Sequence, residues 1–267
     1  IMLPPEQWLK DAKRIAIGRS ARVYHGAEHR PNLVVRNLPD RYTAYCHRCH
    51  EGGVVLKEFV KVEQPTVKAA ESTVTVPTDA VPLFLNGVPN SAVPWARLVA
   101  FLHSKSMSVD YLKGYNPKYS ASTERLLLDM PDQTVGRSLR SASTAKWLTY
   151  RSAVSYVRAS ALAVEGRRLF VTEDCFSAIK AAHSLPQTFV PTALMGTEAY
   201  NDFLRLALSS AGVVLCLDND NAGLSAAPKI QRALRLLDVP CKTVYPSAGC
   251  DPKDMELDWF RNVVESD

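Results

Sequence analysis

The chain has 267 residues, of which 46% are hydrophobic and 22% are charged, as in an ordinary globular protein. This length suits one large domain or two to three small ones, and the composition excludes a disordered, collagen-like or disulfide-stapled chain. No run of about 18 apolar residues occurs, and no secretory signal is visible, so we expect no membrane span. Six cysteines without an export signal predict reduced thiols in a cytoplasmic protein, free to bind metal.

The formal net charge of +5 is unevenly distributed. Residues 1–50 hold nine basic and four acidic side chains, and residues 133–168 hold seven basic and one acidic. Residues 169–267 reverse the balance, with eight basic and thirteen acidic side chains. A basic surface suits a polyanion and a carboxylate-rich block suits divalent cations, although ordinary scatter of surface charge is an alternative.

The N-terminal third of the sequence predicts a small β unit and a linker. A short helix is expected over residues 5–17, with proline near its start. Short apolar runs then alternate with turn residues up to residue 60, and they are too few to stabilise the unit over residues 1–60 by burial alone. Residues 61–82 lack a helical period and are predicted to be a linker.

The remaining residues predict two further parts. Residues 83–166 form a mixed segment with one helix expected over 91–104. From residue 167 to 267 strands alternate with helices, which predicts a parallel α/β sheet covered on both faces. The expected strands are 169–172, 189–195, 213–217 and 241–245, and the expected helices are 175–183, 198–208, 222–237 and 255–264.

Carboxylates follow one of these strands directly, in the run Asp218-Asn219-Asp220-Asn221-Ala222-Gly223. Asp218 and Asp220 therefore stand at the carboxyl end of a strand, where open α/β sheets bind their ligands. Their oxygens suit Mg²⁺ or Mn²⁺, and Gly223 permits a tight turn into the next helix. The alternative is a polar loop in which an aspartate caps that helix.

Two other strands also lead into acidic residues. Glu173 follows the strand 169–172, and Asp251 and Asp254 follow the last strand. Taken alone, Glu173 could be a helix-start charge, and Asp251 before Pro252 could be a helix cap. Because a parallel sheet gathers the carboxyl ends of its strands at one edge, the three positions together predict a divalent-cation site.

This combination resembles the TOPRIM domain of DNA primases and topoisomerases. The resemblance implies that Glu173, Asp218 and Asp220 bind the catalytic Mg²⁺, and Gly223 matches the glycine that follows the second acidic motif. The turn Leu194-Met195-Gly196-Thr197 is similar to one in phage primases.

Two positions depart from the family pattern. Asp174 stands where the family has glycine, and Ser177 stands where an acidic residue often lies four positions after the glutamate. These departures put a secondary metal contact in question and keep a decayed, non-catalytic site open as an alternative.

A basic segment precedes the acidic motifs, with Gly136-Arg137 followed by Lys146-Trp147-Leu148. Bacterial and phage primases carry a similar pair of motifs, so the resemblance implies that Arg137 and Lys146 contact nucleotide phosphate. Basic groups facing a metal cluster would neutralise the remaining charge of a triphosphate. We count Asp251 and Asp254 with them as nucleotide- or template-binding candidates, and the alternative for each basic residue is an ordinary solvated side chain.

Cysteine and histidine cluster near the N-terminus. Cys46 and Cys49 form a Cys-x₂-Cys half-site for tetrahedral Zn²⁺, and a unit with so small a core would gain from a metal. His25 and His29 are the nearest candidates for the other half. His47 and His50 compete with them, and a pair of buried thiols beside surface histidines is the alternative.

The same cluster is similar to the zinc ribbon of phage primases. Their ribbon ends in Cys-x₂-Cys followed by a glycine pair, as at Gly52-Gly53. Two histidines in the first half depart from the cysteines usual there, so Cys46 and Cys49 are the stronger candidates.

The order of zinc ribbon, basic segment and TOPRIM sheet resembles a DNA primase of the phage or bacterial type. The resemblance implies an α/β fold with an N-terminal zinc-ribbon-like β unit, then a primase core whose C-terminal part is the TOPRIM sheet flanked by helices. It also implies Mg²⁺- or Mn²⁺-dependent synthesis of short RNA primers on single-stranded DNA from ribonucleoside triphosphates. Such an enzyme would act in DNA replication, in the bacterial host's cytoplasm if the chain is of phage origin.

No Gly-Lys pair occurs, so the sequence holds no P-loop, and a replicative helicase is expected as a separate partner. Two other functions stay open. The same carboxylates could serve a TOPRIM nuclease that hydrolyses a phosphodiester, or the chain could be a non-catalytic zinc-ribbon protein that binds single strands. A strand-passing topoisomerase is disfavoured because the chain has little room for its additional domains.

Overall fold

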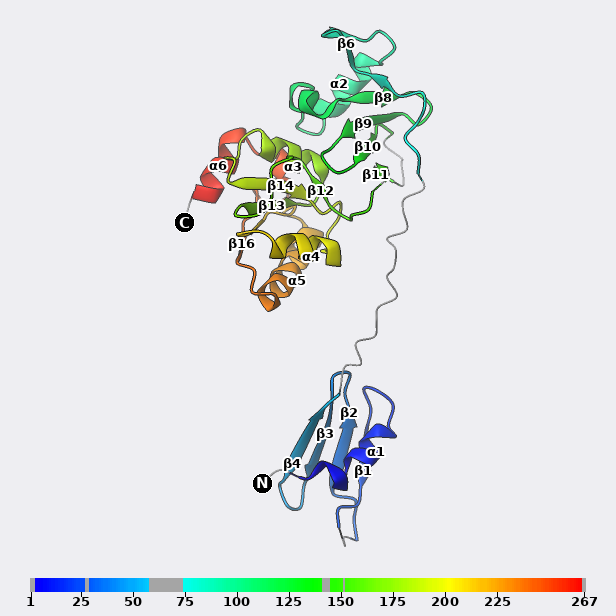
Figure 1. The fold of residues 1–267 in the computed structure, drawn as a ribbon, viewed down its shortest axis with the longest axis vertical. Helices are drawn as coiled ribbons and strands as arrows, with labels where there is room; N and C mark the ends of the chain where they lie inside the picture. The colour runs from blue at the N-terminus through cyan, green and yellow to red at the C-terminus, as the bar shows by residue number, and fades with distance from the viewer. Residues whose placement is uncertain (1–2, 27–28, 58–73, 141–144, 151, 266–267) are drawn as a thin grey trace. The chain divides into compact units, whose positions relative to one another are not determined.

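The computed structural model describes residues 3–26, 29–57, 74–140, 145–150 and 152–265. The chain divides into two compact units, residues 1–67 and 68–267, shown as ribbons in Figure 1. The predicted linker over 61–82 falls partly outside the described residues, because residues 58–73 are not among them. No helix in the described part of the chain is long and apolar enough to cross a bilayer.

The N-terminal unit is a four-stranded antiparallel sheet in the order β1-β2-β3-β4. Its strands are β1 (Ser20–Val23), β2 (Leu33–Asn37), β3 (Arg41–Cys46) and β4 (Gly52–Leu56). One helix was expected over 5–17, but the chain forms the 3₁₀ turn η1 (Pro5–Gln7) and the helix α1 (Leu9–Lys13). The break falls at Trp8, whose backbone is non-helical and whose side chain is fully buried in the core.

The core of this unit is small. A β-carbon on Gly53 would lie 2.8 Å from the Trp8 ring, so the glycine leaves room for the indole. Cys46, a predicted metal ligand, is itself part of this core, so metal binding and packing are linked here. The fully packed members are Leu3, Trp8, Ala12, Leu33, Val35, Ala44 and Cys46.

The first part of the second unit is built on a five-stranded antiparallel sheet in the order β11-β10-β9-β8-β5. Its strands are β5 (Val81–Pro82), β8 (Lys118–Ser120), β9 (Arg125–Asp129), β10 (Thr134–Ser138) and β11 (Trp147–Tyr150). Around it lie the hairpin β6 (Phe84–Leu85) and β7 (Val88–Pro89), the helix α2 (Trp95–His103) and the 3₁₀ helix η2 (Asp110–Tyr115). The helix falls inside the predicted range 91–104.

The second sheet has the order β12-β14-β13-β15-β16. Four of its strands are parallel, as expected, whereas β12 (Val157–Arg158) is an antiparallel edge strand that the sequence did not indicate. The parallel strands are β13 (Arg168–Thr172), β14 (Phe189–Ala193), β15 (Gly212–Leu215) and β16 (Cys241–Thr243). The helical elements are α3 (Cys175–Ala182), α4 (Asn201–Leu208), α5 (Asn221–Leu236), the 3₁₀ turn η3 (Pro252–Asp254) and α6 (Leu257–Glu265).

Alternate side chains of these strands enter cores on opposite faces of the sheet. Phe170 and Val214 pack with Phe260 of α6, whereas Leu169 and Val213 pack on the side that α4 and α5 cover. A third core joins α3 to the upstream antiparallel sheet. Both sheets therefore belong to one compact unit, and the α/β fold predicted from the sequence is confirmed.

Candidate active site and candidate metal centre

The two acidic motifs follow neighbouring strands of the second sheet. After β13 the chain adds β14 on one side, then crosses to place β15 on the other side of β13. Ligands of open α/β sheets bind where the strand order reverses in this way, beyond the carboxyl ends of the strands. Glu173 follows β13 and Asp218 closely follows β15, so the topology places both carboxylates at that point.

Glu173 and Asp218 are half-buried, and each has a buried carboxylate oxygen without a hydrogen-bond partner among the described residues. Burial, followed by the charge of Asp251 and of Glu173, raises the pKa of Asp218 to about 8. Burial also raises the pKa of Glu173, and the charge of Asp220 adds to the effect. Buried carboxylate oxygens without a hydrogen-bond partner suit a hard divalent cation, so these two donors fit Mg²⁺.

Asp174 joins the acidic cluster. Oxygens of Asp174, Asp218 and Asp251 lie within 4.8 Å of one another. The other Asp174 oxygen, Oδ1, accepts a hydrogen bond of 2.9 Å from the backbone N–H of Ser177 and so caps α3. Ser177 is fully buried beneath this cap. The aspartate that departs from the family glycine therefore adds a carboxylate to the site, which comparison with the motif did not reveal.

A buried lysine lies inside this cluster. The Nζ of Lys253 donates a hydrogen bond of 2.9 Å to Asp174 Oδ2 and another to Asp251. Only 8% of the Lys253 side chain is exposed. Although burial lowers the pKa of Lys253, the two carboxylates outweigh it and raise the pKa well above its ordinary value. Sequence reasoning missed this residue, because nothing in the local pattern distinguishes it from a surface lysine.

Among the described residues Glu173 does not join that group of three carboxylates, and neither does Asp220. Asp220 is exposed, and its Oδ1 caps α5 by accepting hydrogen bonds of 2.9 Å from the N–H groups of Ala222 and Gly223. A β-carbon on Gly223 would lie 2.0 Å from the carbonyl oxygen of Asp218, so only glycine permits the helix to approach this closely. The charge of Asp220 nevertheless raises the pKa of Glu173. The metal-binding role of Asp220 stays a prediction.

Asp254 has structural partners. Its Oδ2 accepts a hydrogen bond of 3.0 Å from the backbone N–H of Asp251, and its Oδ1 accepts one of 2.7 Å from the Ser106 hydroxyl. Of the two acids predicted here, Asp251 lines the cavity described next, and Asp254 does not. Asp254 therefore holds the turn that positions Asp251.

A cavity of about 470 Å³ faces the carboxylates. Basic side chains from the upstream part of the same unit, Lys105, Arg137 and Lys146, line it together with the acidic residues. Arg137 and Lys146 were predicted for such a surface, whereas Lys105 was not. The lining residues are Lys105, Arg137, Ala145, Lys146, Trp147, Glu173, Asp174, Phe176, Met195, Gly196, Asp218, Asp251 and Lys253.

Aromatic rings hold Arg137 in place. Its guanidinium carbon lies 5.7 Å from the centre of the Phe101 ring and 5.4 Å from that of Trp147, its partner across the β10–β11 pair. The buried Nε of Arg137 has no partner among the described residues, and burial lowers the pKa of the group. A stacked guanidinium with an unused donor suits an incoming anion.

The hairpin that carries these basic residues is built around a glycine and an arginine. A β-carbon on Gly136 would lie 2.8 Å from the Tyr150 ring, which explains the glycine before Arg137. The buried Arg125 donates to the carbonyl oxygens of Gly136 and Ala145, at 3.0 and 2.7 Å. Arg125 thus links the middle of β10 to the segment that leads into β11, a role that the sequence did not indicate.

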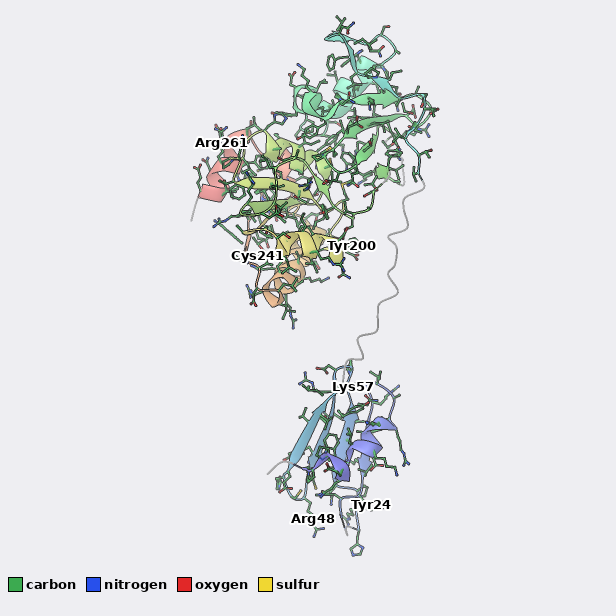
Figure 2. The ribbon with its side chains drawn as sticks, in the orientation of Figure 1. Tyr24, Arg48, Lys57, Tyr200, Cys241 and Arg261 are labelled. Atoms are coloured by element: carbon green, nitrogen blue, oxygen red, sulfur yellow. The ribbon has the colours of Figure 1, made fainter. Side chains whose placement is uncertain are left out.

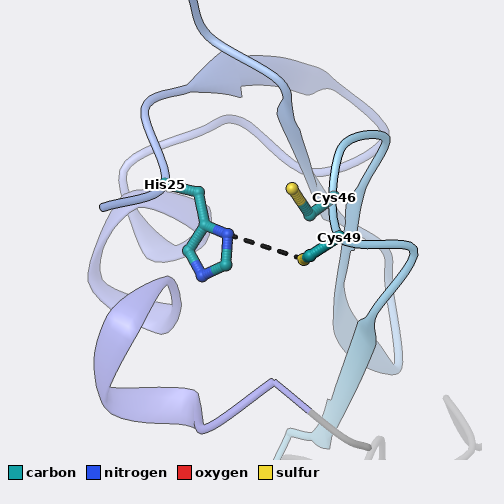
Figure 3. A group of neighbouring side chains, drawn as sticks. All are labelled: His25, Cys46 and Cys49. Carbon is teal, nitrogen blue, oxygen red and sulfur yellow. Dashed lines mark hydrogen bonds between the residues drawn. The ribbon is translucent and has the colours of Figure 1, made fainter. Parts of the chain in front are cut away.

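The N-terminal unit holds a second group of candidate ligands, shown in Figure 3. Ligand atoms of His25, Cys46 and Cys49 lie within 4.8 Å of one another, and Cys49 Sγ is 3.7 Å from His25 Nδ1. On the other side of the ring, His25 Nε2 is 3.1 Å from Gln7 Oε1, which orients Nδ1 toward the sulfurs. Although burial raises it, the N–H groups of Cys49 and Arg48 lower the pKa of the Cys46 thiol overall. Two thiols and an imidazole fit Zn²⁺.

The other predicted histidines do not join this group among the described residues. His29 is exposed. His47 and His50, the competing candidates, both contact Tyr45: the His47 ring packs against it at 5.1 Å, and His50 Nδ1 is 3.3 Å from its hydroxyl. His25 is thus the histidine that the fold brings to the cysteines, and the assignment of His29 stays a prediction.

Comparison with protein families identifies part of the chain. The Toprim-like family model matches residues 171–256, a range that includes Glu173, Asp218 and Asp251. The chain therefore contains a Toprim-like domain, as the sequence predicted. No curated protein matches the sequence.

Solved structures extend the likeness in fold beyond this domain. The RNA polymerase domain of the Mycobacterium tuberculosis primase DnaG is 17% identical, with a TM-score of 0.51 over 64% of this chain and 76% of that one. About two thirds of the chain is thus similar in fold to a primase RNA polymerase domain.

Two other structures match over different shares of the chain. A DNA primase domain from Pseudomonas aeruginosa is 19% identical, with a TM-score of 0.45 over 58% of this chain and 54% of that one. The chain thus spans about half the length of that structure. The zinc-binding and RNA polymerase domains of the Aquifex aeolicus primase are 13% identical, with a TM-score of 0.46 over 91% of this chain and 81% of that one.

Proposed function

We propose that this chain is a DNA primase of the bacterial and phage type, which makes short RNA primers on single-stranded DNA during replication. The observation that carries this proposal is that Glu173 and Asp218, each with an unpaired, buried oxygen, line the same cavity as Arg137 and Lys146. Acidic groups for a cation opposite basic groups for phosphate are what nucleotidyl transfer from a triphosphate needs. The likeness of the fold to a primase RNA polymerase domain supports the same conclusion.

Each side of the cavity has a distinct task in this proposal. Glu173 and Asp218 would hold Mg²⁺ or Mn²⁺, with Asp220 beside them. A divalent cation bound there would lower the pKa of the attacking hydroxyl and neutralise charge on the reacting phosphoryl group. Arg137, held between Phe101 and Trp147, would receive triphosphate oxygens without having to become ordered first.

The N-terminal unit is proposed to bind Zn²⁺ through His25, Cys46 and Cys49 and to help select the template. Tyr24 is 62% exposed, and it projects at the same end of the unit as Arg48 (Figure 2). An aromatic ring and a basic group beside the candidate zinc ligands suit stacking and phosphate contacts with single-stranded DNA. A replicative helicase is proposed as a separate partner, in the bacterial cytoplasm where such replication takes place.

The test is primer synthesis on single-stranded DNA with ribonucleoside triphosphates and Mg²⁺, comparing the native chain with Asp218→Asn. The substitution keeps the shape of the side chain and removes its charge, so we expect labelled RNA products to fall by about 100-fold or more, the scale of losing one main electrostatic contact in a transition state. Asp258→Asn removes an exposed carboxylate from the first turn of α6 and is the matched control, with native yield expected.

Two other results would assign another function. Cut DNA without RNA products, with the cutting lost in Asp218→Asn, would establish a TOPRIM nuclease. Retained DNA binding with neither products nor Mg²⁺ binding would establish a non-catalytic single-strand-binding protein. The carboxylate of Asp174 in the cluster speaks against a decayed site.

A further inference from the structure

The ammonium of Lys253 occupies a position between two carboxylates of the candidate active site. Its Nζ donates to Asp174 at 2.9 Å and also to Asp251, and these acids begin α3 and η3, two separate elements. Both acids belong to the group of three whose oxygens lie within 4.8 Å of one another. A positive charge is therefore already present inside the cluster.

Contacts on its other side hold Lys253 in this position. The Nζ of the buried Lys180 donates to the carbonyl oxygen of Lys253 at 2.6 Å and to that of Ser106 at 3.3 Å. The hydroxyl of Ser106 in turn donates to Asp254, at the end of η3. Lys253 therefore points into the site because its backbone is anchored from α3 and from the upstream part of the unit.

We propose that Lys253 is an internal cation of the active site, which neutralises Asp174 and Asp251 and so limits how tightly the site binds a divalent cation. This inference rests on the proposed use of a divalent cation by Glu173 and Asp218. A cation bound by all the acids together would lie within a few ångströms of the ammonium, and repulsion between the two would oppose it. Glu173 and the unpaired oxygen of Asp218 are then the donors left for the metal.

A site of limited metal affinity suits nucleotidyl transfer. With only Glu173 and Asp218 left to hold it, a divalent cation would exchange readily with one carried by the incoming triphosphate. In this account Lys253 is a positioning residue: it acts on the metal through Asp174 and Asp251.

The test is a titration of the zinc-loaded full chain with Mn²⁺, followed by electron paramagnetic resonance, with no nucleotide or DNA present. Lys253→Met keeps the length of the side chain and removes its charge, and we expect the dissociation constant for Mn²⁺ to fall about tenfold or more. Lys253→Arg keeps the charge and should bind Mn²⁺ like the native chain.

Lys118→Met is the matched control. It removes another partly buried ammonium of the same unit, which donates to Asp129 and not to any of the three clustered carboxylates. We expect it to lower thermal stability without tightening Mn²⁺ binding. A purely structural role for Lys253 predicts the same behaviour for both methionine variants, so tighter binding in Lys253→Met alone separates the two explanations.

Unchanged or weaker Mn²⁺ binding by Lys253→Met, in protein whose metal-free melting shows that it is folded, would overturn the proposal. If that variant does not fold without metal, the comparison is made in an Asp174→Asn background. There the substitution of Lys253 leaves only one carboxylate, that of Asp251, without its charged partner. Adding Lys253→Met there should again tighten Mn²⁺ binding, and failure to do so would overturn the proposal. Because the titration contains no nucleotide, its result stands independently of whether the chain makes primers.

Discussion

The two units of the chain each bring together candidate cation ligands, but the packing that positions those residues differs. In the N-terminal unit the candidate ligand Cys46 is itself fully buried in a small core, of which seven described side chains are buried members. In the second unit Glu173 and Asp218 follow strands whose apolar side chains fill cores on both faces of a sheet. The first unit therefore has only a small core to position its candidate ligands, whereas large cores on both faces of a sheet position the carboxylates of the second.

This difference shows in the electrostatics of the two sites. Burial raises the pKa of the Cys46 thiol, but hydrogen bonds from backbone N–H groups outweigh burial and lower this pKa overall. A lower pKa favours the thiolate, which is the form that binds Zn²⁺. Burial and neighbouring carboxylates do the opposite to Asp218, whose pKa rises to about 8. A metal in the N-terminal unit would serve folding, and a metal in the second unit would serve chemistry.

The largest expected effect is the response to zinc removal. We expect Cys49→Ser, or a strong chelator, to unfold the N-terminal unit completely, since structural zinc sites contribute about 10–16 kcal/mol in small zinc-binding peptides. Hydrogen exchange should show protection lost over β2 and β3 and retained over β13 and β15. Cys250→Ser, a cysteine of the second unit that is also partly exposed, is the control and should change neither region. Retained protection over β2 and β3 in zinc-free Cys49→Ser would show that the small core suffices.

A smaller effect is expected where packing positions the carboxylates of the second unit. A β-carbon on Gly223 would meet the carbonyl oxygen of Asp218 at 2.0 Å, so Gly223→Ala must displace either α5 or Asp218. We expect a loss of about 1–3 kcal/mol in the free energy of unfolding, the usual cost of overpacking. Mn²⁺ affinity, followed by titration, should fall as well.

Gly114→Ala is the control for this effect, because a β-carbon there would meet nothing within 4 Å. It should leave Mn²⁺ affinity unchanged. Equal Mn²⁺ affinity in Gly223→Ala and the native chain would mean that α5 moves and Asp218 does not, which would separate the metal site from the packing of this helix.

The parts of the fold that the sequence predicted are those with strong local periodicity. Every strand and helix expected from residue 169 onward is present, because continuous apolar runs alternate there with helical spacing. The antiparallel strands around β9 and β10 and the edge strand β12 escaped prediction, since short strands in a mixed segment carry no distinct period. The helix expected over 5–17 was interrupted because Trp8 is drawn into the core, an effect of tertiary packing.

The candidate site shows the same difference between local and long-range information. Carboxylates after the strands could be predicted to lie near one another, because a parallel sheet brings the carboxyl ends of its strands together. The contact between Lys253 and Asp174 joins residues 79 positions apart, so no local sequence pattern predicts it. Asp174 was interpreted as a departure from a family glycine because a motif compares single positions, whereas the fold shows which neighbours a side chain meets.

The smallest expected effect is a difference in the sign of the pH dependence of the two units. Asp218 holds its proton up to about pH 8 in the folded state, against an ordinary pKa of 3.8. The folded state therefore binds more protons than the unfolded chain between these values, and the metal-free second unit should lose stability as the pH rises from about 4 to about 8. Zinc binds thiolates in competition with protons, so the zinc-loaded N-terminal unit should gain stability over the upper part of that range.

Thermal melts at pH 5 and pH 8 in a strong chelator would follow the second unit, and Asp218→Asn should flatten its pH dependence because the titrating group is gone. Adding Mg²⁺ in place of the chelator should restore stability more at pH 8 than at pH 5, since the metal binds the carboxylate and not the acid. Equal slopes in the native chain and Asp218→Asn would mean that Asp218 is ionised in the folded protein near its ordinary pKa. The pH dependence of the second unit would then give no evidence that its fold holds the Asp218 carboxylate in its protonated form.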